Sequence, residues 1–435
     1  MNSSRKRLSV ITLGCSKNTV DTEHLLAMLP EDAIEITDEV SGHIDCLLIN
    51  TCGFIGDAKE ESIQTILDAV ARKNDGEIDR IAVFGCLSQR YSSELPSEIP
   101  EVDAWFGARD LRPVADWIAE EFKVRLNGKN AGLRRFEPAS YAYLKVSEGC
   151  DRRCSYCAIP HIRGAHRSVP MEDIVSEATE LVRKGAREII LIAQDTTYYG
   201  LDLYGKRCLA ELLQKLSGID GLEWIRIHYS YPDDFPEDVL EQMADNPKVC
   251  KYLDIPLQHI SDNVLSNMHR HVDGKWTREL ISRMREKVPG VSLRTTMIVG
   301  HPGEGETEFN ELLEFVRSAG FERLGAFKYS EEEGTWGAGH LKDDVPADVK
   351  QSRYEALMEL QAEKSLAYNL SRVGDVEKVL VDAIGDGYLV CRSQHESPEV
   401  DGEIIVPAAD GVKVGDFLNV RITEADYYDL RAELI

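Results

Sequence analysis

The sequence of 435 residues has no run of about eighteen apolar residues, the length that a membrane-crossing helix needs. Its first residues, MNSSRKRLSV, include basic side chains but lack the apolar core and the cleavage site of a secretory signal. We therefore expect a cytoplasmic protein without a membrane partner.

Positive charge is also scarce. The chain has 50 Lys and Arg against 76 Asp and Glu, which gives a formal net charge of −26 at pH 7. Such an excess of acid repels a nucleic-acid backbone overall and favours encounter with a basic partner. The excess of acidic residues is still compatible with a local basic groove. The acidic residues can also serve solubility alone.

Disulfides are not expected. Ten cysteines in a long intracellular chain serve more often as metal ligands, catalytic thiols or small buried side chains than as a disulfide framework. The length exceeds what one hydrophobic core usually serves, so two or three domains are expected.

The first domain is predicted to cover residues 1–125. Short apolar runs, such as LSVITL, CLLIN and IAVF, alternate there with amphipathic segments. In one of these segments Ile63, Ile66, Leu67 and Val70 have the spacing of one face of an α-helix. This alternation predicts an α/β fold that begins with an open parallel sheet.

Residues 126–140 contain Gly and Arg without periodicity and are predicted to be a linker. The segment 141–370 is predicted to be a partial barrel of six β/α units, whose chemistry lies at the carboxyl ends of its strands. Its strand candidates are 142–146, 188–193, 224–228, 252–255, 293–299 and 323–328. The remainder, 371–435, has five short alternating segments and predicts a small antiparallel β-barrel of the OB-like type.

The stretch EGCDRRCSYCAIP places Cys150, Cys154 and Cys157 directly after the first predicted barrel strand. Three thiolates at this spacing can bind three irons of a 4Fe-4S cluster and leave the fourth iron without a protein ligand. The vacant position can hold the amino and carboxylate groups of S-adenosylmethionine. An electron from the cluster can then break a carbon–sulfur bond of that molecule and give a 5′-deoxyadenosyl radical.

Two other interpretations of this loop stay open. Three cysteines can form a zinc site, and His161 and His166 lie close by in the sequence. A ribbon-type zinc site normally adds a second CxxC pair or a His pair, so the iron-sulfur interpretation is favoured. The cysteines can also be packing residues.

A second set of three cysteines is spread along the first domain. Cys15, Cys52 and Cys86 each lie just past the carboxyl end of a predicted parallel strand, where the strands of an open sheet converge on one crevice. Helix N-termini at that edge favour thiolates. The pattern predicts a second site with three ligands, although cysteine is also common in buried strands. The cysteines left as packing or surface residues are Cys46, Cys208, Cys250 and Cys391.

The cysteine loop resembles the signature of the radical SAM superfamily, which has an aromatic residue, here Tyr156, before the last cysteine. The resemblance implies that the backbone of Tyr156 lies near the adenine of S-adenosylmethionine. MIVGHPGE resembles a strand motif of the superfamily, which implies that Ile298 and Gly300 lie beside the adenosyl group. LIAQDTTYYG implies that Gln194 or Asp195 lies near the methionine end.

Along essentially its whole length the chain resembles the methylthiotransferases of this superfamily. The segments LGCSKNTVDTE, SEGCDRRCSYCAIP, YLDIPLQH, FKYSEEEGT and PEVDGEI are most similar to the branch that modifies an aspartate of a ribosomal small-subunit protein. The resemblance implies two 4Fe-4S clusters, S-adenosylmethionine and a C-terminal TRAM domain. Ser16 stands where proline is usual and His301 where phenylalanine is usual, and RGAHRSVP replaces a more basic run.

The implied reaction inserts a methylthio group at the β-carbon of the aspartate, and no side chain is singled out as catalytic. The implied partners are the small-subunit protein S twelve, free or in the assembled subunit, and an electron donor such as flavodoxin or ferredoxin. Contact with nucleic acid would be incidental, through the ribosome. The segment 371–435 is expected to dock the basic substrate, and its deletion is expected to leave cleavage of S-adenosylmethionine intact.

Two alternatives remain. The first is methylthiolation of adenosine in transfer RNA, for which the C-terminal segment needs a basic face. Its six Lys and Arg against fourteen Asp and Glu argue instead for a basic protein partner. The second is a non-catalytic iron-sulfur or zinc scaffold, which formation of 5′-deoxyadenosine eliminates.

Overall fold

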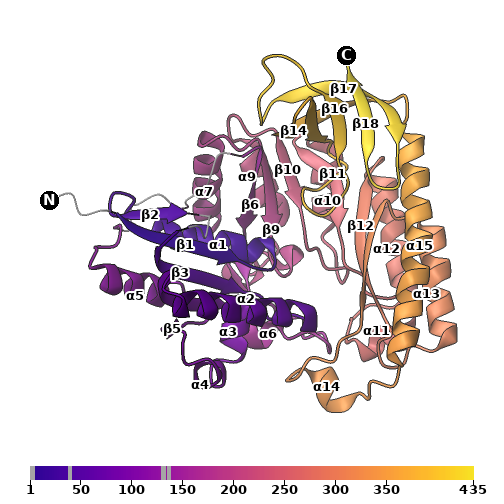
Figure 1. Cartoon of the computed structure of the whole chain (residues 1–435). Coiled ribbons are helices and arrows are strands. Elements are labelled where there is room, and N and C mark those ends of the chain that lie inside the picture. Colours follow the sequence, from indigo (N-terminus) through magenta and orange to yellow (C-terminus); the bar gives the residue numbers. More distant parts are fainter. Residues whose placement is uncertain (1–4, 38–41, 129–133, 135–138) are drawn as a thin grey trace. The chain divides into compact units, whose positions relative to one another are not determined.

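The structure is a computed structural model that describes residues 5–37, 42–128, 134 and 139–435 (Figure 1). Two compact units are present. The first contains the described residues of Met1–Phe136, Glu148–Asp151 and Cys157–His166, and the second those of Glu137–Ser147, Arg152–Tyr156 and Arg167–Ile435. Part of the predicted linker 126–140 lies outside the described residues. No helix in the described part of the chain is long and apolar enough to cross a membrane.

The first unit is built on a parallel five-stranded sheet in the order β2-β1-β3-β4-β5. Its strands are β1 (Lys6–Thr12), β2 (Ile34–Thr37), β3 (Ile44–Thr51), β4 (Ile78–Gly85) and β5 (Ala104–Trp105). The three long strands were predicted from their apolar runs. The strands β2 and β5 were not, because edge strands of four and two residues are too short to give a periodic signal.

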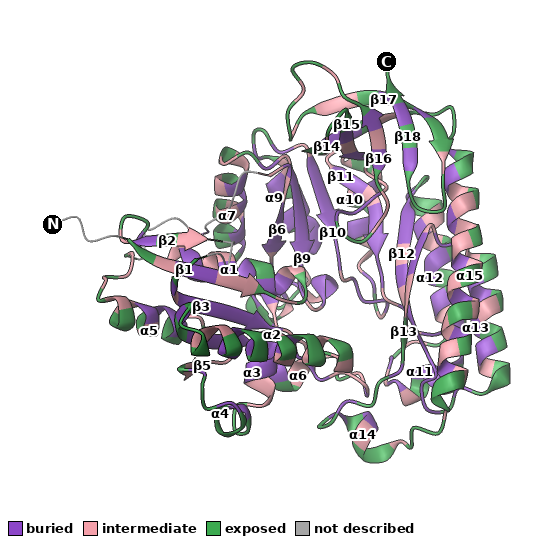
Figure 2. Cartoon of the chain, viewed as in Figure 1, coloured by how far each residue is buried: buried purple, intermediate pink, exposed green. Residues whose placement is uncertain are grey.

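Helices cover both faces of this sheet. One face packs against α1 (Ser16–Ala27) and α5 (Arg112–Phe122), and the other against α2 (Gly56–Asn74) and α3 (Cys86–Arg90). Figure 2 shows the central strand β3 buried and the outer surfaces of the helices exposed. In α2 the buried stripe contains Ile66, Ala69 and Val70, while Leu67 is 44% exposed. The buried face of α2 therefore includes Ala69, whereas the sequence predicted Leu67 on that face.

The second unit contains a six-stranded parallel sheet in the order β13-β12-β11-β10-β9-β6. All six predicted strands are present, and helices alternate with them along the chain as in an incomplete β/α barrel. The strands are β6 (Tyr141–Lys145), β9 (Glu188–Ile192), β10 (Trp224–Ile227), β11 (Val249–Asp254), β12 (Ser292–Val299) and β13 (Arg323–Lys328). The principal helices are α7 (Met171–Arg183), α9 (Leu209–Ser217), α10 (Glu237–Asp245), α12 (Gly274–Lys287), α13 (Glu306–Ala319) and α15 (Ala347–Ser371).

Short elements connect these strands and helices. They are α4 (Leu95–Glu98), β7 (Ser147–Glu148), α6 (Ile159–Ile162), β8 (Arg167–Ser168), a 3-10 turn (Thr196–Tyr198), α8 (Leu201–Tyr204), α11 (Asp262–Asn267) and α14 (Trp336–His340). The cysteine loop lies between β7 and α6, so it has little regular structure of its own.

The C-terminal part of the second unit is a closed barrel in the order β14-β15-β16-β18-β17. Its strands are β14 (Val376–Ile384), β15 (Tyr388–Arg392), β16 (Ile404–Pro407), β17 (Phe417–Ala425) and β18 (Leu430–Leu434). These are the five strands that the alternating segments predicted. Their inward side chains, among them Val381, Leu389, Ile404 and Ile422, form a separate buried cluster.

The connection between β15 and β16 inserts into the amino end of the six-stranded sheet. Residues 392–401, called here the inserted segment, contact every strand of that sheet. The strand residues in contact are Tyr141, Tyr143, Glu188, Arg226, Tyr252, Ser292, Arg294 and Arg323. Most of them lie in the first half of their strands, so the inserted segment closes the end of the barrel opposite to the carboxyl ends.

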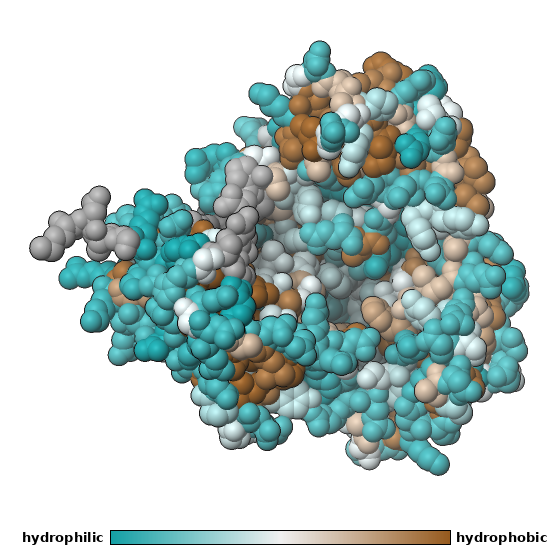
Figure 3. Space-filling view, in the orientation of Figure 1, coloured by the Kyte–Doolittle hydropathy of each residue, from teal (hydrophilic) through white to brown (hydrophobic). Residues whose placement is uncertain are grey.

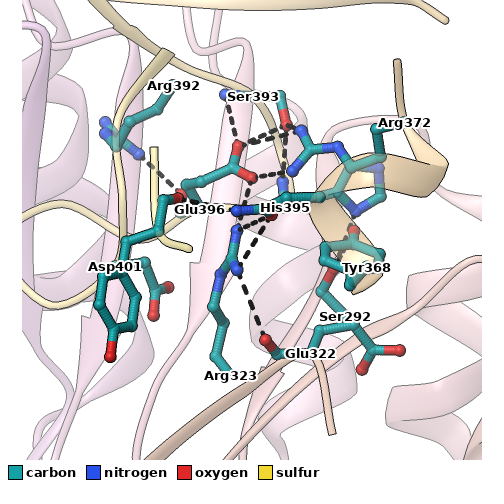
Figure 4. Close-up of polar contacts among 12 residues, drawn as sticks. Ser292, Glu322, Arg323, Tyr368, Arg372, Arg392, Ser393, His395, Glu396 and Asp401 are labelled. Carbon is teal, nitrogen blue, oxygen red and sulfur yellow. Dashed lines mark hydrogen bonds and ion pairs between the residues drawn. The ribbon is translucent and has the colours of Figure 1, made fainter. Parts of the chain in front are cut away.

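Charged groups dominate this contact (Figure 4). The fully buried carboxylate of Glu188 lies 2.6 Å from Arg226 and 2.9 Å from Arg392. Glu396 binds Arg372 and lies 3.2 Å from Arg323. Burial alone would raise the pKa of each glutamate, but the guanidinium groups hold both below the ordinary value. The inserted segment is therefore held by buried, fully paired charges.

Candidate metal centres

The first unit brings the ends of three neighbouring strands to one edge of its sheet. Cys15 follows β1 and caps α1, Cys52 follows β3, and Cys86 is the first residue of α3 after β4. A Cβ on Gly14, whose φ is +89°, would lie only 2.9 Å from Sγ of Cys52. Glycine is therefore required before Cys15, because the turn passes directly over the Cys52 side chain.

The three thiols influence one another. Burial raises the pKa of Cys52, and it raises the pKa of Cys86 to about 11. The Cys15 thiol adds to both increases. The Arg163 guanidinium opposes both. Cys15 is exposed, Cys52 is half-buried and Cys86 is buried.

The cysteine loop supplies the second set of thiols, and Cys150, Cys154 and Cys157 are all half-buried. Within the second unit, Nη1 of Arg270 lies 3.6 Å and the hydroxyl of Tyr231 3.9 Å from Sγ of Cys154. The Cys154 sulfur is therefore within contact distance of one guanidinium and one phenol.

Neighbouring residues fix the loop around Cys154. The Nε of Arg152 donates to Asp195 at 2.7 Å, and its Nη1 donates to Asp233 at 3.0 Å. The Tyr231 ring lies between two cations, with the guanidinium carbons of Arg152 and Arg270 each 4.1 Å from its centroid. The guanidinium groups of Arg152, from the loop, and Arg270, from outside it, are therefore held against Tyr231 near the Cys154 thiol.

Of the residues assigned to S-adenosylmethionine by resemblance, Tyr156 lies in the cysteine loop and the others lie at the carboxyl ends of β9 and β12. Tyr156 packs against a buried cluster that includes Ile298. Gly300 has φ +74°, and a Cβ there would lie 2.3 Å from the Lys350 side chain, so only glycine fits. Asp195 is buried and accepts hydrogen bonds from Arg152 and Thr197. Gln194, next to it, is half-buried.

Among the residues that the structure describes, no three His, Cys, Asp or Glu side chains are placed to hold a single metal ion. A cluster makes a different demand, because each thiolate binds a different iron. Each set supplies three thiols, the ligand type that an iron-sulfur cluster uses. The cysteines Cys46, Cys208, Cys250 and Cys391 are buried, as expected of packing residues.

Sequence reasoning missed three arginines. Arg152 lies within the cysteine motif, and Arg163 follows it closely in the sequence. Their closeness to the motif could have marked both as candidate site residues. Arg270 lies more than a hundred residues away, and nothing in its local sequence marks it. Its position beside Cys154 follows only from the fold, which brings the loop between α11 and α12 to this thiol.

Three family models match the chain. Residues 7–107 match "Uncharacterized protein family UPF0004", residues 144–316 match "Radical SAM superfamily" and residues 373–435 match "TRAM domain". The order and extent of the matches agree with the three predicted parts of the chain.

Curated relatives match over nearly the full length. "Ribosomal protein uS12 methylthiotransferase RimO" of Porphyromonas gingivalis is 48% identical over 434 residues, with 99% of both chains covered. The protein of the same name from Christiangramia forsetii is 47% identical and covers 99% of this chain and 94% of its own. The chain belongs to the RimO family. Members of the RimO family are radical SAM methylthiotransferases, so this chain is an enzyme of that type and the scaffold alternative no longer applies.

Solved structures support the RimO-family fold. The radical S-adenosylmethionine methyltransferase TsrM from Kitasatospora setae, solved with cobalamin and a [4Fe-4S] cluster, matches with a TM-score of 0.55 at 14% identity and covers 75% of each chain. The cobalamin-dependent enzyme OxsB matches with a TM-score of 0.51 at 13% identity, covering 82% of this chain and 56% of its own. At these identities the likeness concerns the fold alone.

Proposed function

We propose that this enzyme replaces a β-hydrogen of an aspartate in ribosomal protein uS12 with a methylthio group. The observation that carries the proposal is the presence of two separate sets of three cysteines at the carboxyl ends of parallel strands. Full-length identity of 47% to 48% to proteins named for this activity supports the choice of substrate. A ribosomal substrate is also consistent with a place in the cytoplasm.

Each cysteine set would hold one 4Fe-4S cluster. Cys150, Cys154 and Cys157 would bind three irons of the first, and the other three cysteines, Cys15, Cys52 and Cys86, would bind three irons of the auxiliary cluster. When bound, the first cluster and S-adenosylmethionine supply a 5′-deoxyadenosyl radical, and the auxiliary cluster holds the sulfur to be transferred. The electron donor proposed is a flavodoxin or a ferredoxin.

The residues of the chain would orient these groups and exclude water. Arg270 holds a positive charge beside the Cys154 thiolate, and Arg152 ties the loop to Asp195. The apolar cluster of Val264, Met268, Ile298 and Tyr329 packs against Tyr156 and shields the loop on that side. Such shielding limits side reactions of a radical with solvent.

A radical route suits an aspartate. Its β-carbon carries a weakly acidic C–H bond beside a carboxylate, so removal of a proton there is unfavourable and abstraction of a hydrogen atom is reasonable. The proposal therefore assigns the difficult step to the cofactors and the positioning to the protein.

The C-terminal barrel is proposed to dock uS12. It is acidic, and large apolar side chains are exposed on it, as the upper part of Figure 3 shows. Its exposed apolar residues include Val376, Ile384, Tyr388, Tyr427, Tyr428 and Ile435. Aromatic and acidic groups together suit a basic protein surface better than the phosphates of transfer RNA.

The test uses anaerobically reconstituted enzyme with a chemical reductant and S-adenosylmethionine. Free uS12, assembled small subunits and unmodified transfer RNA are offered in parallel, and peptides and nucleosides are analysed by mass spectrometry. We expect a methylthio group on an aspartate of uS12. The variant with Cys15, Cys52 and Cys86 replaced by Ala is the matched control, which should still form 5′-deoxyadenosine but transfer no sulfur. Methylthio-adenosine in the RNA with unmodified uS12 would contradict the proposal.

A further inference from the structure

A buried arginine connects the loop after α6 to one of the cysteines of the first unit. Arg163 is only 4% exposed. Its Nε donates to Sγ of Cys86 at 3.2 Å. Its two terminal nitrogens donate to Asp21 at 2.6 Å, Asn18 at 2.6 Å and Glu148 at 3.2 Å. All its donating nitrogens are therefore engaged, and one of them points at a sulfur.

The acceptor atoms around Arg163 are held in place. The Asn18 amide nitrogen donates to the carbonyl oxygens of Leu13 and Thr51, so its oxygen faces the arginine. That oxygen also lies 3.8 Å from Sγ of Cys86. Asn18 thus orders both the guanidinium and the thiol.

The backbone that carries Arg163 is fixed as well. Arg109 donates to the carbonyl oxygens of Ile162 at 2.9 Å and His161 at 2.6 Å, at the end of α6. Ile162 and Ala158 of the same segment pack against Cys86. The guanidinium cannot leave the thiol without disrupting this packing.

The charged group next to the Cys86 sulfur is positive. The cation of Arg163 contacts the sulfur directly through Nε, while the carboxylates of Asp21 and Glu148 contact Nη1 of the cation and not the sulfur. Hydrogen bonds to a sulfur ligand and nearby positive charge stabilise the reduced, more negative state of an iron-sulfur cluster. A buried site strengthens this effect, since little solvent screens it.

We propose that Arg163 is a positioning residue for the auxiliary cluster, which fixes the Cys86 thiolate by an N–H···S hydrogen bond and raises the reduction potential of the cluster. This inference rests on the auxiliary cluster of the proposed function. Asp21 limits the effect, because its negative charge partly offsets that of the arginine.

The test uses the full chain with Cys150, Cys154 and Cys157 replaced by Ala, so that only the auxiliary cluster can form. Iron and sulfide are measured after anaerobic reconstitution, and the midpoint potential is measured by a redox titration followed by electron paramagnetic resonance. In this parent, R163Q should lower the potential and D21N should raise it. The double variant R163Q/D21N should return close to the parent. The matched control R80Q removes an exposed cation of β4 that pairs with Glu121, and it should change nothing.

Opposite shifts distinguish an electrostatic role from a structural one, since two destabilising changes would not move the potential in opposite directions. If R163Q binds no cluster, the midpoint potential of D21N tests the proposal, because this variant keeps the hydrogen bond between Arg163 and Cys86. An unchanged or lower potential in D21N, or an unchanged potential in loaded R163Q, would overturn the role of Arg163. A parent that binds no iron at all would instead show that the auxiliary cluster of the proposed function is wrong.

Discussion

His301 is a buried side chain that makes the protein sensitive to acid. Its ring lies edge-on to Tyr329, with centroids 4.8 Å apart, and its Nδ1 lies 3.0 Å from the carbonyl oxygen of Pro302. Burial lowers the pKa of His301 to about 4 from the ordinary 6.5. Between these values the unfolded chain binds a proton that the folded chain does not, so stability is lost as the pH falls below 6.5.

Replacing His301 by Phe removes this titration and keeps the ring. Unfolding of the apo-protein by urea is measured at pH 7.5 and at pH 5.5. The wild type should lose roughly 1 kcal/mol more stability between the two pH values than H301F. Equal losses would show that His301 does not titrate differently in the folded and unfolded states.

The cysteines were the most predictable residues of the site, because their spacing and their place after strands both carry chemical meaning. The arginines were not. The contacts of Arg163 with Cys86 and of Arg270 with Cys154 join segments far apart in sequence, and no local pattern encodes them. Leu67 illustrates a similar limit, since its spacing matched an apolar face but the packing of α2 left it exposed.

At the scale of elements, the packing of the inserted segment against the six-stranded sheet was not predicted from the sequence. Its residues, SQHESPEVD with a preceding arginine, are polar and contain proline, a composition typical of a surface loop. Arg392, Ser393, Glu396 and Ser397 of the segment are buried because the strands of the six-stranded sheet present paired charges to it. The long strands were predictable from their own apolar runs, whereas this burial depends on partners elsewhere in the chain.

The inserted segment gives a direct test of buried charge. The substitution E396Q leaves the buried cation Arg323 without its carboxylate and removes one of the two carboxylates that bind Arg372. We expect a loss of roughly 3–5 kcal/mol in the free energy of unfolding, measured by urea titration. The control E180Q removes an exposed partner of Arg183 on α7 and should cost less than about 1 kcal/mol. Similar costs for both variants would contradict the assigned role of Glu396.

At the scale of the molecule, the C-terminal barrel is part of the second unit. Removing residues 371–435 would leave Glu188, Arg226 and Arg323 buried without several of their partners. We therefore expect the truncated chain to lose both its fold and its cleavage of S-adenosylmethionine, contrary to the expectation from the sequence that cleavage would stay intact. Formation of 5′-deoxyadenosine at the normal rate by the truncated enzyme would refute this.

Docking of uS12 is better tested by surface substitutions. Asp410, Glu424 and Glu433 are exposed acids of the C-terminal barrel. The variant D410N/E424Q/E433Q should bind uS12 several-fold more weakly at low salt, and the difference should shrink as salt rises, because exposed charges are screened. The control E311Q/E314Q neutralises exposed acids of α13 and should bind normally. Equal affinity of the two variants would argue against docking through the C-terminal barrel.

The transfer of a hydrogen atom from substrate to cofactor tests the whole account most directly. A uS12 substrate with deuterium at the aspartate β-carbon is incubated with reduced enzyme and S-adenosylmethionine, and both products are analysed by mass spectrometry. The account predicts deuterium in 5′-deoxyadenosine together with a methylthio group on that aspartate. Formation of methylthio-adenosine in transfer RNA, with no deuterium transferred from uS12, would contradict it.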